Sequence, residues 1–103
     1  MTESTILSEV RDALMITWED EQTDRTLLEF IESSKVFFLE TVSDQLLFER
    51  GSRERELLIE RVRYRYNNAL DDFIKNYRSD LATLIQLEAV KEFQKKQVSN
   101  GTN

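Results

Sequence analysis

A helical pattern from Leu57 to Tyr77 constrains the fold of this chain more than any other feature of its sequence. Apolar and aromatic residues recur there every three or four positions, the spacing that places side chains on one side of an α-helix. They are Leu58, Val62, Tyr66, Ala69, Phe73 and Tyr77, with Ile59, Leu70 and Ile74 beside them. No Gly or Pro interrupts this segment. We therefore expect this segment to be a central helix with a broad apolar face, around which the other segments pack. Whether the helix is continuous stays open, because Asn67, Asn68 and Asn76 are weak helix formers.

The composition favours helix in the rest of the chain as well. The 103 residues include no Pro and only two glycines, Gly51 and Gly101, whereas Glu, Arg, Lys and Leu are frequent. This length predicts one domain, and a core of that size is only marginally stable unless other chains cover part of it. The expected fold class is all-α: a small bundle of about three to four helices around the long central helix, with a flexible C-terminal segment.

The absence of certain residue types excludes several classes of function. The chain has no His and no Cys, which removes the usual catalytic triads, thiol nucleophiles and most zinc sites. It offers no Gly-rich loop for a nucleotide and no pair of carboxylates in an apolar context. We therefore expect no enzymatic activity, no cofactor and no bound metal. The sequence also lacks a signal-peptide pattern and an apolar run of membrane-spanning length, so no membrane partner is expected.

Two helices are expected before the central one. The first should run from Thr2 to Met15, with Ser4 or Thr5 as its cap. Its apolar side would consist of Ile6, Val10, Ala13 and Leu14. The second should run from Arg25 to Val42 behind a cap at Thr23 or Asp24. Its main face would consist of Leu27, Leu28, Ile31, Ser34, Phe38 and Val42.

Phe30 and Phe37 add a second apolar line to this helix. Two lines indicate two neighbours, which are either two helices of the same chain or one internal and one external partner. The acidic loop before the helix does not fit an EF-hand, because Arg25 stands where Gly is required and Ile31 where the bidentate Glu belongs. In that loop, Trp18 is expected to plug one end of the helix packing, with a contact to a partner subunit as the alternative.

The segment Ser43–Ser52 interrupts the helical pattern with turn residues. It contains the apolar group Leu46, Leu47 and Phe48. We expect this group to form a short helical turn that folds back on the core, and the alternative is an exposed tip for a partner. The central helix should then begin near Ser52 or Arg53.

One section of the central helix combines Arg61, Arg63 and Arg65 with Tyr64, which a helical wheel places opposite Val62. One interpretation is an ordinary solvated face, and the other is a protein–protein surface, where Arg and Tyr are enriched. The residues expected at a subunit or partner interface are Phe30, Phe37, Leu57, Arg61, Tyr64 and Arg65. DNA binding by the arginines is a minor alternative, because the net charge is −6 and acidic residues lie nearby.

The last part of the chain is amphipathic. A new helix is expected after a cap at Ser79 or Asp80. Its apolar residues are Leu81, Leu84, Ile85, Leu87, Ala89, Val90 and Phe93. We thus divide the chain into a helical core over 1–80, a docking segment over 81–96 and a disordered tail over 97–103.

The sequence between Ile6 and Leu87 resembles the head–tail connector adaptors, or head completion proteins, of long-tailed bacteriophages. In that family a Leu-x-Ile precedes an acidic loop, and an Asp then opens a helix with spaced Leu, Ile and small residues. A Tyr-rich helix and a Phe–Tyr pair precede a Leu-rich end. The matching residues here are Leu14, Ile16, the loop Glu19–Thr23, Asp24, Leu27, Ile31, Ser34, Tyr64, Tyr66, Phe73, Tyr77, Leu81 and Leu84. Family members often have Ala at the position of Ser34, and the RVRYR segment does not match the family pattern.

The resemblance implies a structural virion protein that is made in the bacterial host cytoplasm and ends up at the head–tail interface. Such adaptors form a ring of about twelve subunits under the portal protein. The ring extends the DNA channel without binding DNA specifically, and it is a platform for the stopper or next tail-side connector. The portal-binding residues would be Leu81, Leu84, Ile85, Leu87, Val90 and Phe93. The alternative is a non-enzymatic helical binding module with a regulatory or chaperone-like role.

Overall fold

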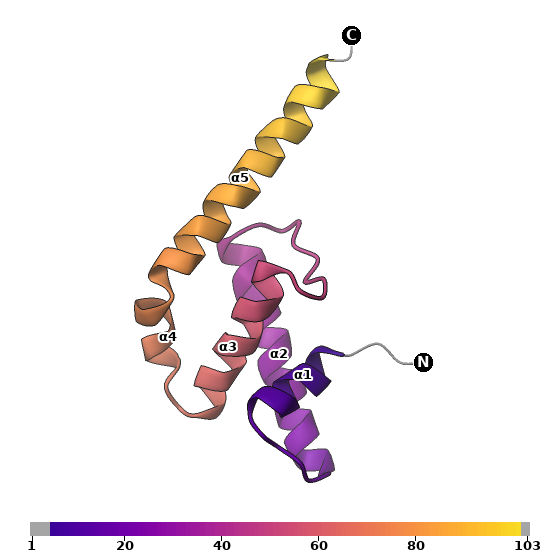
Figure 1. The fold of residues 1–103 in the computed structure, drawn as a ribbon, viewed down its shortest axis with the longest axis vertical. Helices are drawn as coiled ribbons and strands as arrows, with labels where there is room; N and C mark the ends of the chain where they lie inside the picture. The colour runs from indigo at the N-terminus through magenta and orange to yellow at the C-terminus, as the bar shows by residue number, and fades with distance from the viewer. Residues whose placement is uncertain (1–4, 102–103) are drawn as a thin grey trace.

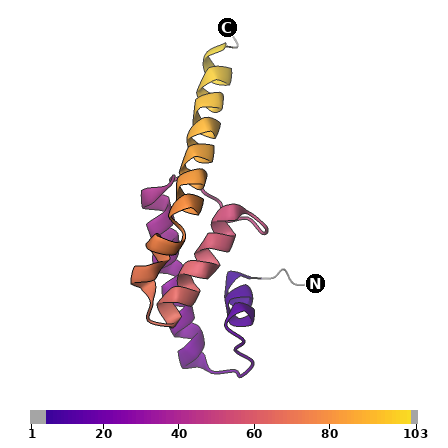
Figure 2. The ribbon, with the colours of Figure 1, turned by 60° about the vertical axis from the view of Figure 1, so that its left-hand side comes forward.

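The computed structural model describes residues 5–101, and these residues form five α-helices and no strand (Figure 1). The helices are α1 (Ile6–Ala13), α2 (Glu21–Thr41), α3 (Arg53–Tyr66), α4 (Leu70–Asn76) and α5 (Arg78–Gly101). The expected all-α class is confirmed. Helix α3 lies in the middle and contacts α1, α2 and α4, whereas α5 contacts α4 and extends past the other helices (Figure 2).

Three helices begin at a side chain that accepts a hydrogen bond from a free backbone N–H of the first turn. Thr5 caps α1 and Ser52 caps α3, in agreement with the sequence-based expectation. Helix α2 begins at Glu21, earlier than expected, because Asp20 accepts from the backbone N–H of Thr23 at 3.0 Å. The cap predicted at Thr23 or Asp24 is therefore wrong.

The segment from Leu57 to Tyr77 is not one continuous helix, because α3 ends at Tyr66 and the chain turns before α4. Asn68 adopts a left-handed conformation with φ 59. The N–H of Ala69 donates to the carbonyl of Tyr64 at 2.8 Å, and the N–H of Asn68 donates to the carbonyl of Arg65 at 3.1 Å. This pair of bonds is a Schellman motif, which Asn tolerates better than most residues.

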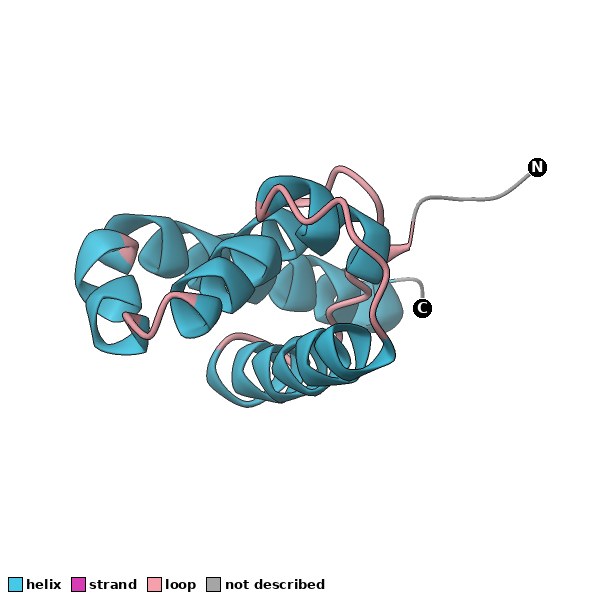
Figure 3. Ribbon diagram, turned by 90° about the horizontal axis from the view of Figure 1, so that it is seen from below, coloured by secondary structure: helices cyan, strands magenta, loops and turns pink. Residues whose placement is uncertain are grey.

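Aromatic rings from α2, α4 and the loop after α2 make the centre of the core. Phe38 is fully buried and lies edge-on to Phe37, Phe48 and Phe73, with ring centroids 5.1–6.4 Å apart. Seen from below, the described residues form helices that are joined by loops, with no strand (Figure 3). The buried apolar residues are Val10, Ile16, Leu27, Ile31, Phe38, Leu46, Phe48, Leu57, Leu58, Val62, Phe73 and Leu84.

The loop between α2 and α3 folds back on the core, as expected, but not as a helical turn. Leu46 and Phe48 are buried, while Leu47 between them is 73% exposed. Residues 46–49 lie outside every helix, and Phe48 adopts a left-handed backbone conformation with φ 54. The predicted helical turn at these residues is therefore wrong.

Several other expectations differ from the structure. Trp18 is 51% exposed, so it does not plug the core. Four residues assigned to apolar faces are exposed: Ala13, Leu28, Tyr66 and Ile74. Helix α5 begins at Arg78, so neither Ser79 nor Asp80 is its cap. Helix α5 continues to Gly101, whereas the sequence predicts a disordered tail that starts at Gln97. Residues 2–4 of the first predicted helix and residues 102–103 of the predicted tail lie outside the described range.

Candidate docking surfaces

Helix α5 carries apolar side chains on two opposite sides. Leu84 is 2% exposed and faces the body of the molecule, and Leu81 beside it is partly buried. Leu87, Val90 and Phe93 are 40%, 51% and 61% exposed. The helical repeat places Leu87 next to the Leu84 side, Val90 farther round and Phe93 opposite Leu84, and we call these three exposed residues the outer face of α5. A helix that is apolar on more than one side is typically covered on each of them, and among the described residues only the Leu84 side is covered.

Ile85 lies on the flank of α5 rather than on its outer face. It borders a hollow of about 200 Å³ against Val42, Ser43 and Asp44 at the end of α2. Glu88 is also on this flank, 7% exposed, and its carboxylate accepts a hydrogen bond from Lys91 at 3.0 Å. That bond and the charge of Glu88 raise the pKa of Lys91. The predicted portal-binding residues are thus divided, with Leu81 and Leu84 used inside the subunit.

A second surface lies where α3 crosses the Phe30–Phe37 line of α2. The guanidinium carbon of Arg61 is 4.4 Å from the ring centroid of Phe37, and that of Arg65 is 5.0 Å from the ring centroid of Phe30. The Nη1 of Arg61 donates to the Oγ of Ser34 at 2.9 Å. Burial, together with the neighbouring charge of Arg65, lowers the pKa of Arg61. We call Phe30, Phe37, Arg61 and Arg65 the arginine seam.

The other two residues predicted at an interface are used inside the subunit. Leu57 is 8% exposed, so it is part of the core and not of an exposed back face. The ring of Tyr64 lies edge-on to Phe73 and Tyr77, at 5.8 and 5.7 Å between centroids. Its hydroxyl accepts a hydrogen bond from Asn76 at 3.0 Å. Tyr64 faces inward because α4 turns back along α3, and Leu57 lies near Tyr77 and Asp80 at the corner that follows α4.

A polar hollow of about 160 Å³ lies between the start of α3 and the start of α5. Its lining residues are Arg53, Glu56, Leu57, Glu60, Tyr77 and Asp80. Tyr77 donates a hydrogen bond to the carboxylate of Glu60 at 2.8 Å, and Arg63 donates to the same oxygen. Within residues 5–101 no cluster of carboxylates has the geometry of a metal site. The arrangement is therefore that of a polar contact between helices.

Sequence reasoning missed the exposure of Leu47 and Met15, which are 73% and 82% exposed. The sequence feature that could have predicted the exposure of Leu47 is its position between two apolar neighbours next to turn residues. For Met15, the corresponding feature is its position directly after the first apolar stripe. Among the described residues, no helix is long and apolar enough to cross a bilayer.

Comparisons of the chain with protein-family models, with curated proteins and with solved structures find no match.

Proposed function

We propose that this chain is a structural virion protein, a head–tail connector adaptor that forms a ring under the portal, extends the DNA channel and presents a platform to a stopper or tail-side connector. The outer face of α5 is the observation on which the proposal mainly rests. Leu87, Val90 and Phe93 form an apolar line on a helix that extends beyond its own bundle (Figure 1). The resemblance to the adaptor family assigns this same segment to the portal.

The binding free energy available from the outer face is consistent with a partner that is itself a ring. Full burial of one apolar side chain of this size is worth roughly 1.5–3 kcal/mol. Three half-exposed side chains therefore give one subunit only a modest affinity. When several subunits bind one portal and also contact each other, each binding event raises the effective concentration for the next. The expected behaviour is weak binding by single chains and stable binding by a complete ring.

The charge of the chain fits a channel through which DNA slides. The net charge is −6, and a protein that binds the DNA backbone tightly needs an excess of Lys and Arg on the surface that it presents. A ring of acidic subunits repels the phosphates, so DNA passes without being held. We therefore propose no specific DNA contact for this protein.

Imaging of the full chain with and without a purified portal ring tests the proposal. Electron microscopy should show an additional ring on one end of the portal. The double variant Leu87→Glu and Phe93→Glu should remove this ring. The matched control is the double variant Met15→Glu and Ile74→Glu, since these side chains are 82% and 42% exposed, lie outside α2 and α5, and undergo a similar chemical change. Portal binding that survives the α5 variant would contradict the proposal.

A truncation gives an independent arm of this experiment. Deletion from Ala89 onward removes Val90 and Phe93 but keeps Leu84, which is buried against the body. The truncated chain should keep its helical circular dichroism and its cooperative unfolding while losing the portal. If the full chain instead bound one partner in a fixed ratio and formed no ring, it would be a helical binding module rather than an adaptor.

A further inference from the structure

We propose that the arginine seam binds an acidic stripe on α2 of a second copy of this chain, so that copies join head to tail through two different surfaces. The stripe consists of Glu29, Glu32 and Glu40. The inference rests on the proposed function for the idea of a ring and adds which surfaces of the subunit meet in it.

The seam presents two cations that have no carboxylate partner among residues 5–101. The ion pairs among the described residues are Arg11–Asp24, Arg55–Glu9, Arg63–Glu60 and Lys91–Glu88. Arg61 and Arg65 belong to none of them. Two neighbouring guanidinium groups repel each other, and a carboxylate placed between them would relieve this repulsion. The seam thus lacks the counter-charge that the other partly buried arginines have.

The geometry of the seam leaves N–H groups of Arg61 available to bind a carboxylate. Arg61 lies over the ring of Phe37 and donates one hydrogen bond, to Ser34. Among the described residues no buried side-chain nitrogen lacks a hydrogen-bond partner, so the remaining N–H groups of Arg61 face solvent. A guanidinium has planar N–H edges that pair with a carboxylate through two parallel bonds, and the contact with Phe37 and the bond to Ser34 restrict its position.

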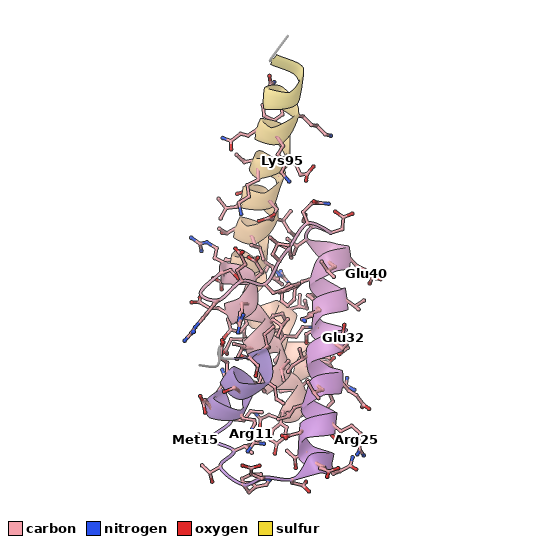
Figure 4. All side chains as sticks on the ribbon, turned by 90° about the vertical axis from the view of Figure 1, so that its right-hand side faces the viewer. Arg11, Met15, Arg25, Glu32, Glu40 and Lys95 are labelled. Atoms are coloured by element: carbon pink, nitrogen blue, oxygen red, sulfur yellow. The ribbon has the colours of Figure 1, made fainter. Side chains whose placement is uncertain are left out.

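The stripe supplies the complementary charge. Glu29, Glu32 and Glu40 are exposed, and the helical repeat places them opposite the buried face of α2, roughly a quarter turn from the Phe30–Phe37 line. Glu32 and Glu40 point away from the other helices (Figure 4). None of the three is in an ion pair among the described residues. Val36, which is 46% exposed, lies between them and gives the stripe an apolar centre for the partly buried rings of the seam.

The seam and the stripe are different surfaces of one subunit, so a contact between them is heterologous. Such contacts repeat from copy to copy and close into a ring when the rotation per copy allows it, whereas a two-fold dimer uses one surface twice. A second copy is favoured over DNA as the occupant because the chain as a whole repels phosphates at its net charge of −6.

A charge-swap experiment on the full chain tests this contact. The seam variant is Arg61→Glu with Arg65→Glu, and the stripe variant is Glu29→Lys, Glu32→Lys and Glu40→Lys. Sedimentation equilibrium at low ionic strength should show self-association of the wild type that weakens with added salt. Each variant alone should associate at least about tenfold more weakly, because like charges then meet. A mixture of the two variants should recover the wild-type association, since every seam again meets a stripe of opposite charge.

Circular dichroism and thermal unfolding show whether each variant is folded. If the double seam variant unfolds, Arg65→Glu alone replaces it, because Arg65 is exposed and its loss leaves the Ser34 bond intact. Self-association of either variant at wild-type strength overturns the inference, and so does a mixture that does not recover. Binding of a labelled DNA duplex that the seam variant loses, without self-association of the wild type, also overturns it.

The two proposals fail in different ways. If the wild type does not bind the portal but self-associates in a charge-dependent way, the proposed function is refuted and the seam contact is supported. Complete rings of the seam variant on a portal refute the seam contact and support the proposed function.

Discussion

The hydroxyl of Tyr77 donates a hydrogen bond to the carboxylate of Glu60 at 2.8 Å, and this bond joins α3 to the corner between α4 and α5. Burial by itself raises the pKa of Glu60, but hydrogen bonds from Arg63 and Tyr77, with the charge of Arg63, outweigh it and lower the pKa. Burial, followed by the bond to Glu60, raises the pKa of Tyr77 to about 12. The contact therefore combines a charged acceptor with a neutral donor over a wide pH range.

The variant Tyr77→Phe should lower the free energy of unfolding by roughly 1–3 kcal/mol at neutral pH, the range for a hydrogen bond to a charged group. Urea unfolding followed by circular dichroism measures this difference. The control is Tyr66→Phe, because Tyr66 is 40% exposed and its hydroxyl makes no hydrogen bond within the described residues. The control should change stability by less than about 0.5 kcal/mol. Equal effects of the two substitutions would contradict the role of the Glu60 bond.

The same comparison predicts a pH dependence with a defined sign. The pKa of Glu60 is lower in the folded chain than the ordinary 4.5, so its contribution is present above that value and is lost as the pH falls through the folded pKa. The pKa of Tyr77 is raised from 10.0 to about 12, so its contribution is present below pH 10.0 and is lost as the pH rises through about 12. The stability difference between wild type and Tyr77→Phe should therefore shrink at both ends. A difference that stays constant across both limits would refute this account.

Met15 ends α1 in a left-handed conformation with φ 61, and its side chain is 82% exposed. This backbone conformation costs an L-residue roughly 1–2 kcal/mol, whereas Gly adopts it freely. Met15→Gly should therefore stabilise the chain by about 0.5–1 kcal/mol, after the greater freedom of Gly in the unfolded state is subtracted. Met15→Ala removes the same side chain but keeps the strain, so it should give no gain. Thermal unfolding of the two variants decides whether the backbone or the exposed side chain matters.

The sequence was sufficient for those features of the fold that depend on local chemistry. Thr5 and Ser52 cap their helices because a hydroxyl before a helical pattern satisfies a free N–H of the first turn. The break at Asn67–Ala69 was not predicted, because the apolar spacing continues across it. Leu58 and Phe73 are both fully buried, but in different helices that fold against each other. Spacing alone does not distinguish one long stripe from two shorter ones that face a shared core.

The candidate surfaces show the same limit. The second line on α2 did predict a second neighbour, and Phe37 indeed contacts Arg61 of α3 and Phe73 of α4. The burial of Leu57 was missed because Tyr77 and Asp80, at the corner between α4 and α5, lie near it, a long-range arrangement that no local pattern encodes. For α5, the sequence predicted an apolar segment, but only the structure separates Leu84 on the body side from Leu87 on the outer face.

Leu84 and Leu87 provide a direct test of this separation. Leu84 is 2% exposed, so Leu84→Ala should lower the free energy of unfolding by about 2–5 kcal/mol through lost burial and a residual cavity. Leu87 is 40% exposed, so Leu87→Ala should lower the free energy of unfolding by less than about 1 kcal/mol. Chemical denaturation of both variants measures the two values. Similar losses for the two leucines would show that α5 packs differently against the body in solution.

Arg55 joins three parts of the chain, and its substitution should show how far they depend on each other. Its Nε donates to Glu9 of α1 at 3.2 Å, its Nη2 donates to the other oxygen of Glu9, and its Nη1 donates to the carbonyl of Phe48 at 3.2 Å. The Arg55 side chain is 11% exposed. Arg55→Met should cost about 2–4 kcal/mol, because it leaves a partly buried carboxylate and a carbonyl without their donor.

The double variant Arg55→Met with Glu9→Met should cost less than the sum of the two single variants, because no buried charge is then left alone. The coupling energy from this cycle, measured by urea unfolding, should be about 1–2 kcal/mol. The matched cycle on Arg63 and Glu60 tests the generality of this effect, since that pair is more exposed and lies within one helix. A smaller coupling is expected there, about 0.5 kcal/mol. If the Arg55–Glu9 cycle were additive, α1 would be held to α3 by apolar contacts alone, and Val10, which is 1% exposed, would be the residue to test next.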